Sequence, residues 1–256
     1  MLVALAGLAF AVSRFAFGDR VGVPDVGVEI ERGLRPIVRR EIALEGTVIE
    51  DPIVADGFAT LLARLRPALG ALPLEPEVVV VESPVVNAAT LPGGIVVVYT
   101  GLVRTLETPE QMAAVLAHEL VHLEHRDPVT QLAREIGMAA IFSAISGGGE
   151  TAAQALLRSA IGLRYSRVAE DRADRGCLEV LARADLDPGA FADALERIVE
   201  AGERAPELLR WLDPHSDVDA RIARARSRSA PHAPRPLDVD WKAVRSVLPS
   251  LFDERP

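Results

Sequence analysis

Cysteine is nearly absent from this chain: Cys177 is the only one among 256 residues. A single cysteine excludes an intramolecular disulfide framework and any cysteine-rich zinc site. Positive charge is also scarce, with 28 Lys and Arg against 37 Asp and Glu and a formal net charge of −9. That balance argues against a general nucleic-acid binder, which needs a basic surface. The composition, 49% hydrophobic and 25% charged, excludes a disordered chain and suits one sizeable domain with appendages.

Long apolar runs are few. Met1 to Phe17 is almost wholly apolar, but it is shorter than the roughly 20 residues that span a bilayer. Small residues at Ala16 and Gly18 resemble a signal-peptide cleavage site, whereas no positive side chain precedes the run. These residues are therefore predicted to be an export signal or a shortened membrane anchor, with a buried N-terminal helix as the alternative. The apolar stretch Ile136 to Ile145 predicts a buried helix.

The rest of the pattern predicts a mostly helical α+β fold. Two β-branched runs, residues 77–82 and 95–99, flank the turn sequence Pro92-Gly93-Gly94 and predict neighbouring strands of a small sheet. Helical periodicity, caps and breakers predict helices over residues 28–45, 53–69, 108–125, 151–176, 188–201, 217–226 and 240–248. Pro36 is expected to break the first helix or to lie in its first turn. The last helix is expected to dock through Trp241 and Val244.

Histidine is also rare, yet three of the five histidines fall within eight residues. His118-Glu119-Leu120-Val121-His122 is an HExxH motif inside a predicted helix. Residues four apart share one helix face, so both imidazoles can reach one ion. Glu119 lies beside them, where its carboxylate can take a proton from an attacking water. The motif predicts a catalytic zinc site, and two partly exposed helix histidines without a metal are the alternative.

A third protein ligand must come from elsewhere. His125 lies about 10 Å along the helix axis from His118, too far for all three histidines to grip one ion easily. Glu170 and Asp174 are four apart in a later helix. That spacing would let Glu170 bind the metal while Asp174 holds a ligand histidine through a hydrogen bond. Cys177 is expected to be a buried small hydrophobic residue, and His232, in a proline-rich linker, to be solvated.

Taken together, these motifs resemble those of the M48 peptidases, zinc endopeptidases of the Ste24 and HtpX type. The resemblance covers roughly residues 45–222 and rests on several motifs in the family's order. These are Glu50-Asp51-Pro52, then Asn87-Ala88 through Leu91-Pro92-Gly93-Gly94, the HExxH at 118–122, Tyr165-Ser166-Arg167-x-x-Glu170-x-x-x-Asp174, and His215 followed six residues later by Arg221-Ile222.

The resemblance implies a zincin-like metallopeptidase fold with the small sheet beside the HExxH helix. It implies one Zn²⁺ per chain held by His118, His122 and Glu170, with Glu119 as general base. Four further roles are implied: Asp174 behind the ligands, His215 facing the substrate oxyanion, Arg221 ordering that corner, and Asn87 lining the cleft. A turn-forming asparagine is the alternative for Asn87.

Two positions depart from the family pattern. The family usually has His-Pro at the position of His215, whereas the order here is Pro214-His215-Ser216. Val121 stands where Gly or Ala is common, and it is expected to crowd the helix packing without touching the ligands. The domain expected from the resemblance is residues 28–226, with residues 1–18 as an apolar N-terminal segment and 227–256 as a proline-rich linker and C-terminal helix.

The expected function is a zinc-dependent endopeptidase acting on polypeptides, in protein quality control at the cell envelope. The expected location is membrane-associated through residues 1–17 or exported, and a cytoplasmic location and the oligomeric state stay open. Substrate backbone is expected to add to the edge of the Ile95–Tyr99 strand. Two alternatives remain: a metal-stabilised chaperone or binding module without turnover, and a zinc hydrolase that does not cleave peptides.

Overall fold

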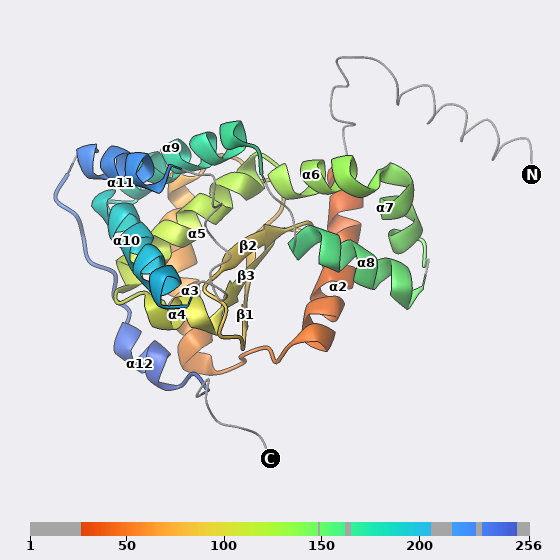
Figure 1. Ribbon diagram of the computed structural model, residues 1–256, viewed down its shortest axis with the longest axis horizontal. Coiled ribbons are helices and arrows are strands. Elements are labelled where there is room, and N and C mark those ends of the chain that lie inside the picture. The colour runs from red at the N-terminus through yellow and green to blue at the C-terminus, as the bar shows by residue number, and fades with distance from the viewer. Residues whose placement is uncertain (1–26, 148, 162–164, 206–216, 229–231, 250–256) are drawn as a thin grey trace, which may run out of the picture.

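A three-stranded sheet lies between two groups of helices in the computed structural model, which describes residues 27–147, 149–161, 165–205, 217–228 and 232–249 (Figure 1). Helices α2, α6, α7 and α8 gather on one side of the sheet. Helices α3, α4, α5, α9, α10 and α11 gather on the other side. The predicted class, α+β and mostly helical, is confirmed. The predictions for residues 1–18 lie outside the described residues.

The element bounds agree closely with several of the predicted ranges. The helices are α2 (Val28–Glu45), α3 (Pro52–Leu65), the 3₁₀ turn η1 (Arg66–Ala68), α4 (Thr100–Thr105), α5 (Pro109–Glu124), α6 (Asp127–Ile136), α7 (Met138–Ile145), α8 (Glu150–Ile161), α9 (Arg167–Arg183), α10 (Gly189–Arg204), α11 (Val218–Ser227) and α12 (Trp241–Ser246). We expected Pro36 to break the helix or to lie in its first turn. Instead, Pro36 lies inside α2, which continues through it without a break. Leu34 and Val38 on either side of it are fully buried, and this packing offsets the lost backbone hydrogen bond.

The sheet contains a strand that the sequence reasoning missed. Strand β2 (Ala88–Leu91) joins the two predicted strands β1 (Glu77–Val81) and β3 (Ile95–Tyr99) in the order β1-β3-β2. β1 is parallel to β3, in register Glu77 with Ile95, and β2 is antiparallel to it, in register Ala88 with Val98. β3 is therefore the central strand and has no open edge. The expectation that a substrate adds to the edge of β3 is wrong: β1 and β2 are the edge strands, and β2 is an edge strand that packs against α5.

Both faces of the sheet are buried, which explains its continuous apolar runs. Val96 and Val98 belong to the larger hydrophobic cluster, which includes α5, α9 and α10. Val79 and Val97 point the other way, into a smaller cluster with α2, α6, α7 and α8. The sheet is thus fixed from both sides, and α5 packs directly against β2 and β3.

Helix α5 is the central helix of the larger layer. The Thr108 side chain accepts from the Gln111 backbone N–H and the Gln111 side chain accepts from the Thr108 backbone N–H, which makes a capping box at the start of α5. Every residue from Gln111 to Leu123 in this helix is buried. Because α5 is enclosed all round, polar side chains on it must find partners inside the protein.

One predicted helix is in fact two. The range 151–176 divides into α8 and α9, and the Ser166 side chain caps α9 by accepting a hydrogen bond from the Ala169 backbone N–H. α9 then continues past Gly176, which had been expected to end it, to Arg183. The predicted buried helix at Ile136 to Ile145 also differs, because α6 ends at Ile136 and α7 leaves Phe142 48% exposed. In the described part of the chain, no helix is both long and apolar enough to cross a bilayer.

The C-terminal helix docks as predicted. Trp241 and Val244 of α12 are buried against the larger cluster. The Trp241 indole N–H donates a hydrogen bond of 2.9 Å to the backbone carbonyl of Leu106, and its ring meets the edge of Phe58. The chain after the proline-rich stretch is therefore packed on the domain through α3 and the end of α4.

Candidate metal centre

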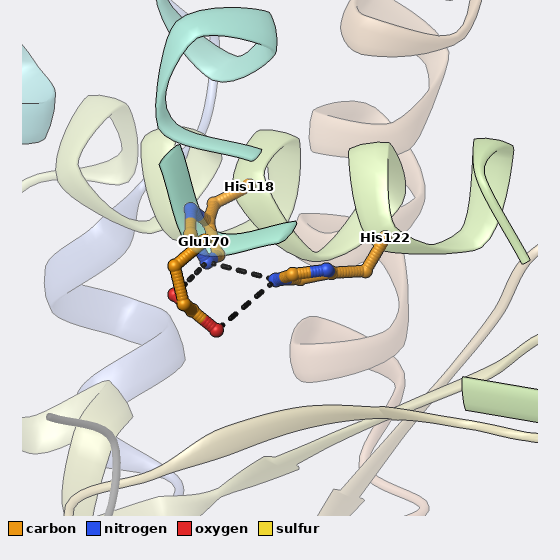
Figure 2. Close-up of side chains that lie close together, drawn as sticks. All are labelled: His118, His122 and Glu170. Atoms are coloured by element: carbon orange, nitrogen blue, oxygen red, sulfur yellow. Dashed lines mark hydrogen bonds and ion pairs between the residues drawn. The ribbon is translucent and has the colours of Figure 1, made fainter. Parts of the chain in front are cut away.

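Three side chains from two helices converge at one point (Figure 2). His118 and His122 lie on α5, one turn apart, and their Nε2 atoms are 3.2 Å from each other. Glu170, in the first turn of α9, places its carboxylate oxygens 3.5 Å from His118 Nε2 and 3.6 Å from His122 Nε2. Both histidines are buried, and Glu170 is half-buried. The structure therefore brings together the three residues that the sequence predicted as ligands.

These spacings fit a zinc ion. A tetrahedral zinc site has bond lengths of about 2.0 to 2.2 Å to nitrogen and oxygen, which places neighbouring ligand atoms about 3.3 to 3.5 Å apart. The three observed separations lie close to that value. The residue types, two imidazoles and one carboxylate, leave a tetrahedral position for water, as catalytic zinc sites do.

The protonation pattern of the histidines also calls for a cation. His122 Nδ1 lies 2.8 Å from the Asp127 carboxylate, and His118 Nδ1 lies 3.3 Å from the Asp174 carboxylate. Because a carboxylate accepts hydrogen bonds, each Nδ1 carries the hydrogen in the neutral ring and each Nε2 carries a lone pair. In that neutral state two lone pairs and the Glu170 carboxylate face one small space, an arrangement that suits a bound cation.

Asp174 is held by a buried arginine. Arg221 on α11 donates to it twice, from Nε at 2.9 Å and from an Nη at 2.7 Å. Burial acts to raise the pKa of Asp174, but the interactions with His118 and Arg221 outweigh it and lower the pKa to about 2. In the metal-free protein, burial acts to lower the pKa of His118, yet Asp174 and Glu170 raise it to about 9.

Glu119 lies beside the ligands but bonds to the sheet. Its Oε2 accepts from both the backbone N–H and the hydroxyl of Thr90 on β2, each at 2.9 Å. The same hydroxyl is 2.8 Å from the backbone carbonyl of Glu119. Glu119, the general base predicted from the sequence, is thus hydrogen-bonded to the edge strand β2, and it is 4% exposed.

Aromatic rings hold both imidazoles in place. Tyr165 stacks on His122 with ring centroids 4.2 Å apart, and Phe191 of α10 stacks on His118 at 5.7 Å. The Tyr165 hydroxyl donates to the backbone carbonyl of Thr90 at 3.2 Å. Burial first, and then the charges of Glu119 and other nearby carboxylates, raise the pKa of Tyr165 well above 10. Tyr165 therefore stays protonated and acts as a donor.

The other predicted residues have different outcomes. His215 lies outside the described residues. Asn87 is buried just before β2, and its backbone carbonyl accepts from the Tyr99 N–H, so it extends the β2–β3 pairing. His125 ends α5, exposed and outside the three-ligand group, and His232 is exposed. Cys177 is fully buried in the middle of α9 rather than at its end. Its thiol donates a hydrogen bond to the backbone carbonyl of Ala114.

Sequence reasoning missed three residues that touch the centre: Thr90, Asp127 and the ring of Phe191. Asp127 follows the HExxH motif by five positions and opens α6, a place that indicates only a helix start. Thr90 is one residue of a strand that was not predicted. Thr90 and Phe191 arrive through tertiary packing, and the five-residue spacing from His122 to Asp127 does not by itself indicate a contact.

Comparisons with known proteins point to one peptidase family. A sequence model described as peptidase family M48 matches residues 59–229. The beta-barrel assembly-enhancing protease of Yersinia pestis is 23% identical over 245 residues, 84% of this chain and 48% of that protein. Its counterpart in Escherichia coli K12 is 24% identical over 235 residues, 86% and 45% of the two chains. The mitochondrial metalloendopeptidase OMA1 of Schizosaccharomyces pombe is 29% identical over 167 residues, 64% and 50%. The chain thus spans about half the length of the curated relatives it matches.

Proposed function

Because the chain belongs to peptidase family M48, we propose that it is a zinc-dependent endopeptidase that hydrolyses peptide bonds by general-base catalysis. The observation that carries the proposal is the group formed by His118, His122 and Glu170, whose ligand atoms all lie within 4.8 Å of one another. Relatives named as proteases support peptide hydrolysis over other zinc chemistry.

The proposed metal ligands are His118, His122 and Glu170. When bound, zinc would supply Lewis-acid polarisation of the scissile carbonyl and a lowered pKa for the attacking water. Asp174 and Asp127 would hold the two histidines in the tautomer that ligates, through the contacts to their Nδ1 atoms. Arg221 would balance the negative charge that Asp174 brings into the interior.

Glu119 is the proposed general base. Its carboxylate would take a proton from the water as the water attacks, and would then pass the proton to the leaving amine. Being next to His118 in sequence and buried on α5 puts Glu119 near the ligands without making it one. In a purely structural zinc site this carboxylate would have no role, which favours an enzyme over a metal-stabilised binding module.

Two further residues have proposed roles toward the substrate, His215 and Asn87. We assign His215 to stabilise the oxyanion by donating a hydrogen bond, an effect worth about 3 to 4 kcal/mol in well-studied sites. Asn87 is assigned to the substrate cleft. The support for both is the resemblance of the motifs in which they stand, together with the His215-to-Arg221 spacing.

The proposed setting is protein quality control at the cell envelope, with residues 1–17 as anchor or export signal. Support comes from the apolar start of the sequence and from the relatives named beta-barrel assembly-enhancing protease. Fractionating cells that express the full chain, and a version lacking residues 1–17, tests this setting. Equal distribution of the two versions between membrane and soluble fractions would contradict it.

The decisive experiment on the activity is Glu119→Gln. Cleavage of denatured casein should fall by about 10²- to 10⁴-fold. Zinc measured by atomic absorption should stay at about one ion per chain. Glu124→Gln, on the same helix but outside the three-ligand group, is the matched control and should keep full activity. Retained cleavage by Glu119→Gln would contradict the proposal. A wild-type chain that binds unfolded casein without cleaving it would favour the binding module instead.

A further inference from the structure

The backbone of Thr90 faces away from the sheet and is already occupied. In the antiparallel pairing of β2 with β3, the Asn87 carbonyl bonds inward to Tyr99. Because bonding direction alternates along a strand, the N–H and C=O of Thr90 point outward. The outward N–H donates to Glu119 Oε2, and the outward carbonyl accepts from the Tyr165 hydroxyl. Both edge groups are thus satisfied by side chains of the metal centre.

This arrangement conflicts with peptide binding at the same place. An extended peptide adds to a sheet edge by bonding to the outward N–H and C=O of the edge strand. β2 is the edge strand beside the metal centre, and Thr90 is only 1% exposed. A peptide cannot pair with β2 at Thr90 while Glu119 and Tyr165 hold those groups.

We propose that Thr90 is the positioning residue of Glu119 and that its backbone is a closed docking point for an extended polypeptide. A bound peptide strand would take the Thr90 N–H from Glu119 and the Thr90 carbonyl from Tyr165. The Thr90 hydroxyl would stay with Glu119 and keep its carboxylate beside the reacting centre. This inference rests on the proposed function for its kinetic part, but the closure of the edge stands independently of it.

The two roles of Thr90 come from different atoms, so they can be separated. The hydroxyl contacts Glu119 at Oε2 and at the backbone carbonyl, 2.9 and 2.8 Å away. The backbone groups remain whatever the side chain is. A side-chain change therefore tests the positioning of Glu119, whereas a change at Tyr165 tests the closure of the edge.

The positioning role is tested with Thr90→Val and Thr90→Ser. Valine keeps the branched shape and loses the hydroxyl, so kcat for casein cleavage should fall by about 10- to 100-fold with KM nearly unchanged. Serine restores the hydroxyl and should recover most of the lost kcat. Zinc content and melting temperature are measured for both variants. Equal losses in valine and serine, or a valine defect confined to KM, would overturn the positioning role.

The closure is tested by binding, with cleavage switched off. In a Glu119→Gln background, Tyr165→Phe keeps the ring that stacks on His122 and removes only the hydroxyl that caps the Thr90 carbonyl. Fluorescein-labelled β-casein should bind this double variant several-fold more tightly than Glu119→Gln alone. Unchanged or weaker binding would overturn the closure of the edge.

Hydrogen exchange distinguishes failure of this inference from failure of the proposed function. Glu119→Ala removes the acceptor of the Thr90 N–H, so exchange at Thr90 should accelerate while exchange at Val96 and Val98 of β3 stays slow. Glu124→Ala is the matched control on the same helix. The measurement needs neither zinc nor cleavage. An equal rise on both strands, or no rise at Thr90, would contradict the assigned contact even in an active peptidase.

Discussion

Arg221 and Asp174 form a two-pronged ion pair that joins α11 to His118 of the candidate metal centre. Both residues are buried: Arg221 is 8% exposed and Asp174 is 2% exposed. Asp174 in turn faces His118. The pair therefore transmits the position of α11, the helix that follows His215 in sequence, to the centre of the site.

Loss of Arg221 should weaken the metal site and the fold together. Arg221→Met leaves the Asp174 carboxylate buried without its main partner, which costs about 3 to 5 kcal/mol when a buried pair is broken. Zinc affinity, measured by competition with a chelator, should fall by about 10- to 100-fold. Arg224→Met is the control, because Arg224 also approaches Asp174, at 3.6 Å, but is partly exposed. Equal effects of the two substitutions would contradict the assigned role.

The three residues of the candidate metal centre and Asp174 behind His118 could be predicted from the sequence, whereas Asp127 and Thr90 could not. HExxH spacing puts His118 and His122 on one helix face whatever surrounds them, and a capping box at Thr108 marks the start of α5. Glu170 and Asp174 share a face for the same reason. Asp127 and Thr90 reach the centre from α6 and β2, so only the packed fold brings them there.

The errors in the predicted elements have local causes. β2 has the sequence Ala-Ala-Thr-Leu, which carries little β-branched signal, and it becomes a strand through pairing with β3. α9 begins at the Ser166 cap, a local signal that lies within a periodic apolar pattern. Missing β2 also caused the wrong substrate edge, since β3 then seemed to have a free side.

Asp127 should matter for metal binding as much as Asp174 does. Asp127→Ala removes the acceptor of the His122 Nδ1–H, so the ring loses its fixed tautomer and orientation. Chelator competition should show zinc affinity about 10- to 100-fold lower. Asp171→Ala serves as control, because Asp171 lies half exposed on α9 and its side chain pairs with Arg175 and Arg224. Unchanged affinity in Asp127→Ala would show that Tyr165 stacking alone holds the ring.

Zinc loading should release a proton near neutral pH. His118 in the metal-free protein has a pKa raised from 6.5 to about 9, so it is protonated at about pH 7.5, and a protonated ring cannot ligate. Zinc must displace that proton. Calorimetric titration of metal-free protein in buffers of different ionisation enthalpy should report release of about one proton per zinc. A binding enthalpy that is independent of the buffer would contradict this protonation state.

The stability of the metal-free protein should depend on pH in a defined direction. A histidine whose folded pKa is raised contributes stability below its unfolded pKa of 6.5, and this contribution is lost as pH rises through about 9. Asp174 has its pKa lowered from 3.8 to about 2, so its contribution is present above 3.8 and is lost as pH falls through about 2. Urea unfolding should therefore show declining stability above about pH 7. A stability that rises steadily from pH 6.5 to 9 would contradict the His118–Asp174 pairing.

Val121 and Gly176 should be energetically coupled across the α5–α9 contact. Val121 was expected to crowd this packing, and Gly176 accommodates it: a Cβ atom at position 176 would lie 2.8 Å from Val121 Cγ1. Val121 cannot turn aside easily, because β-branched side chains have one strongly preferred rotamer in helices. Gly176→Ala alone should therefore lower the free energy of unfolding and disturb the spacing of His118 and Glu170.

The effect of Gly176→Ala on the free energy of unfolding should change sign when Val121 is removed. In a Val121→Ala background the clash is gone, and Gly176→Ala should then stabilise by up to about 1 kcal/mol, since alanine favours a helix interior more than glycine does. Urea unfolding of the wild type, both single variants and the double variant measures the coupling free energy. Zinc content should follow the same order, with the loss in Gly176→Ala recovered in the double variant. Additive effects would mean that α9 shifts freely along α5, so that the distance from Glu170 to the histidines would not be set by this contact.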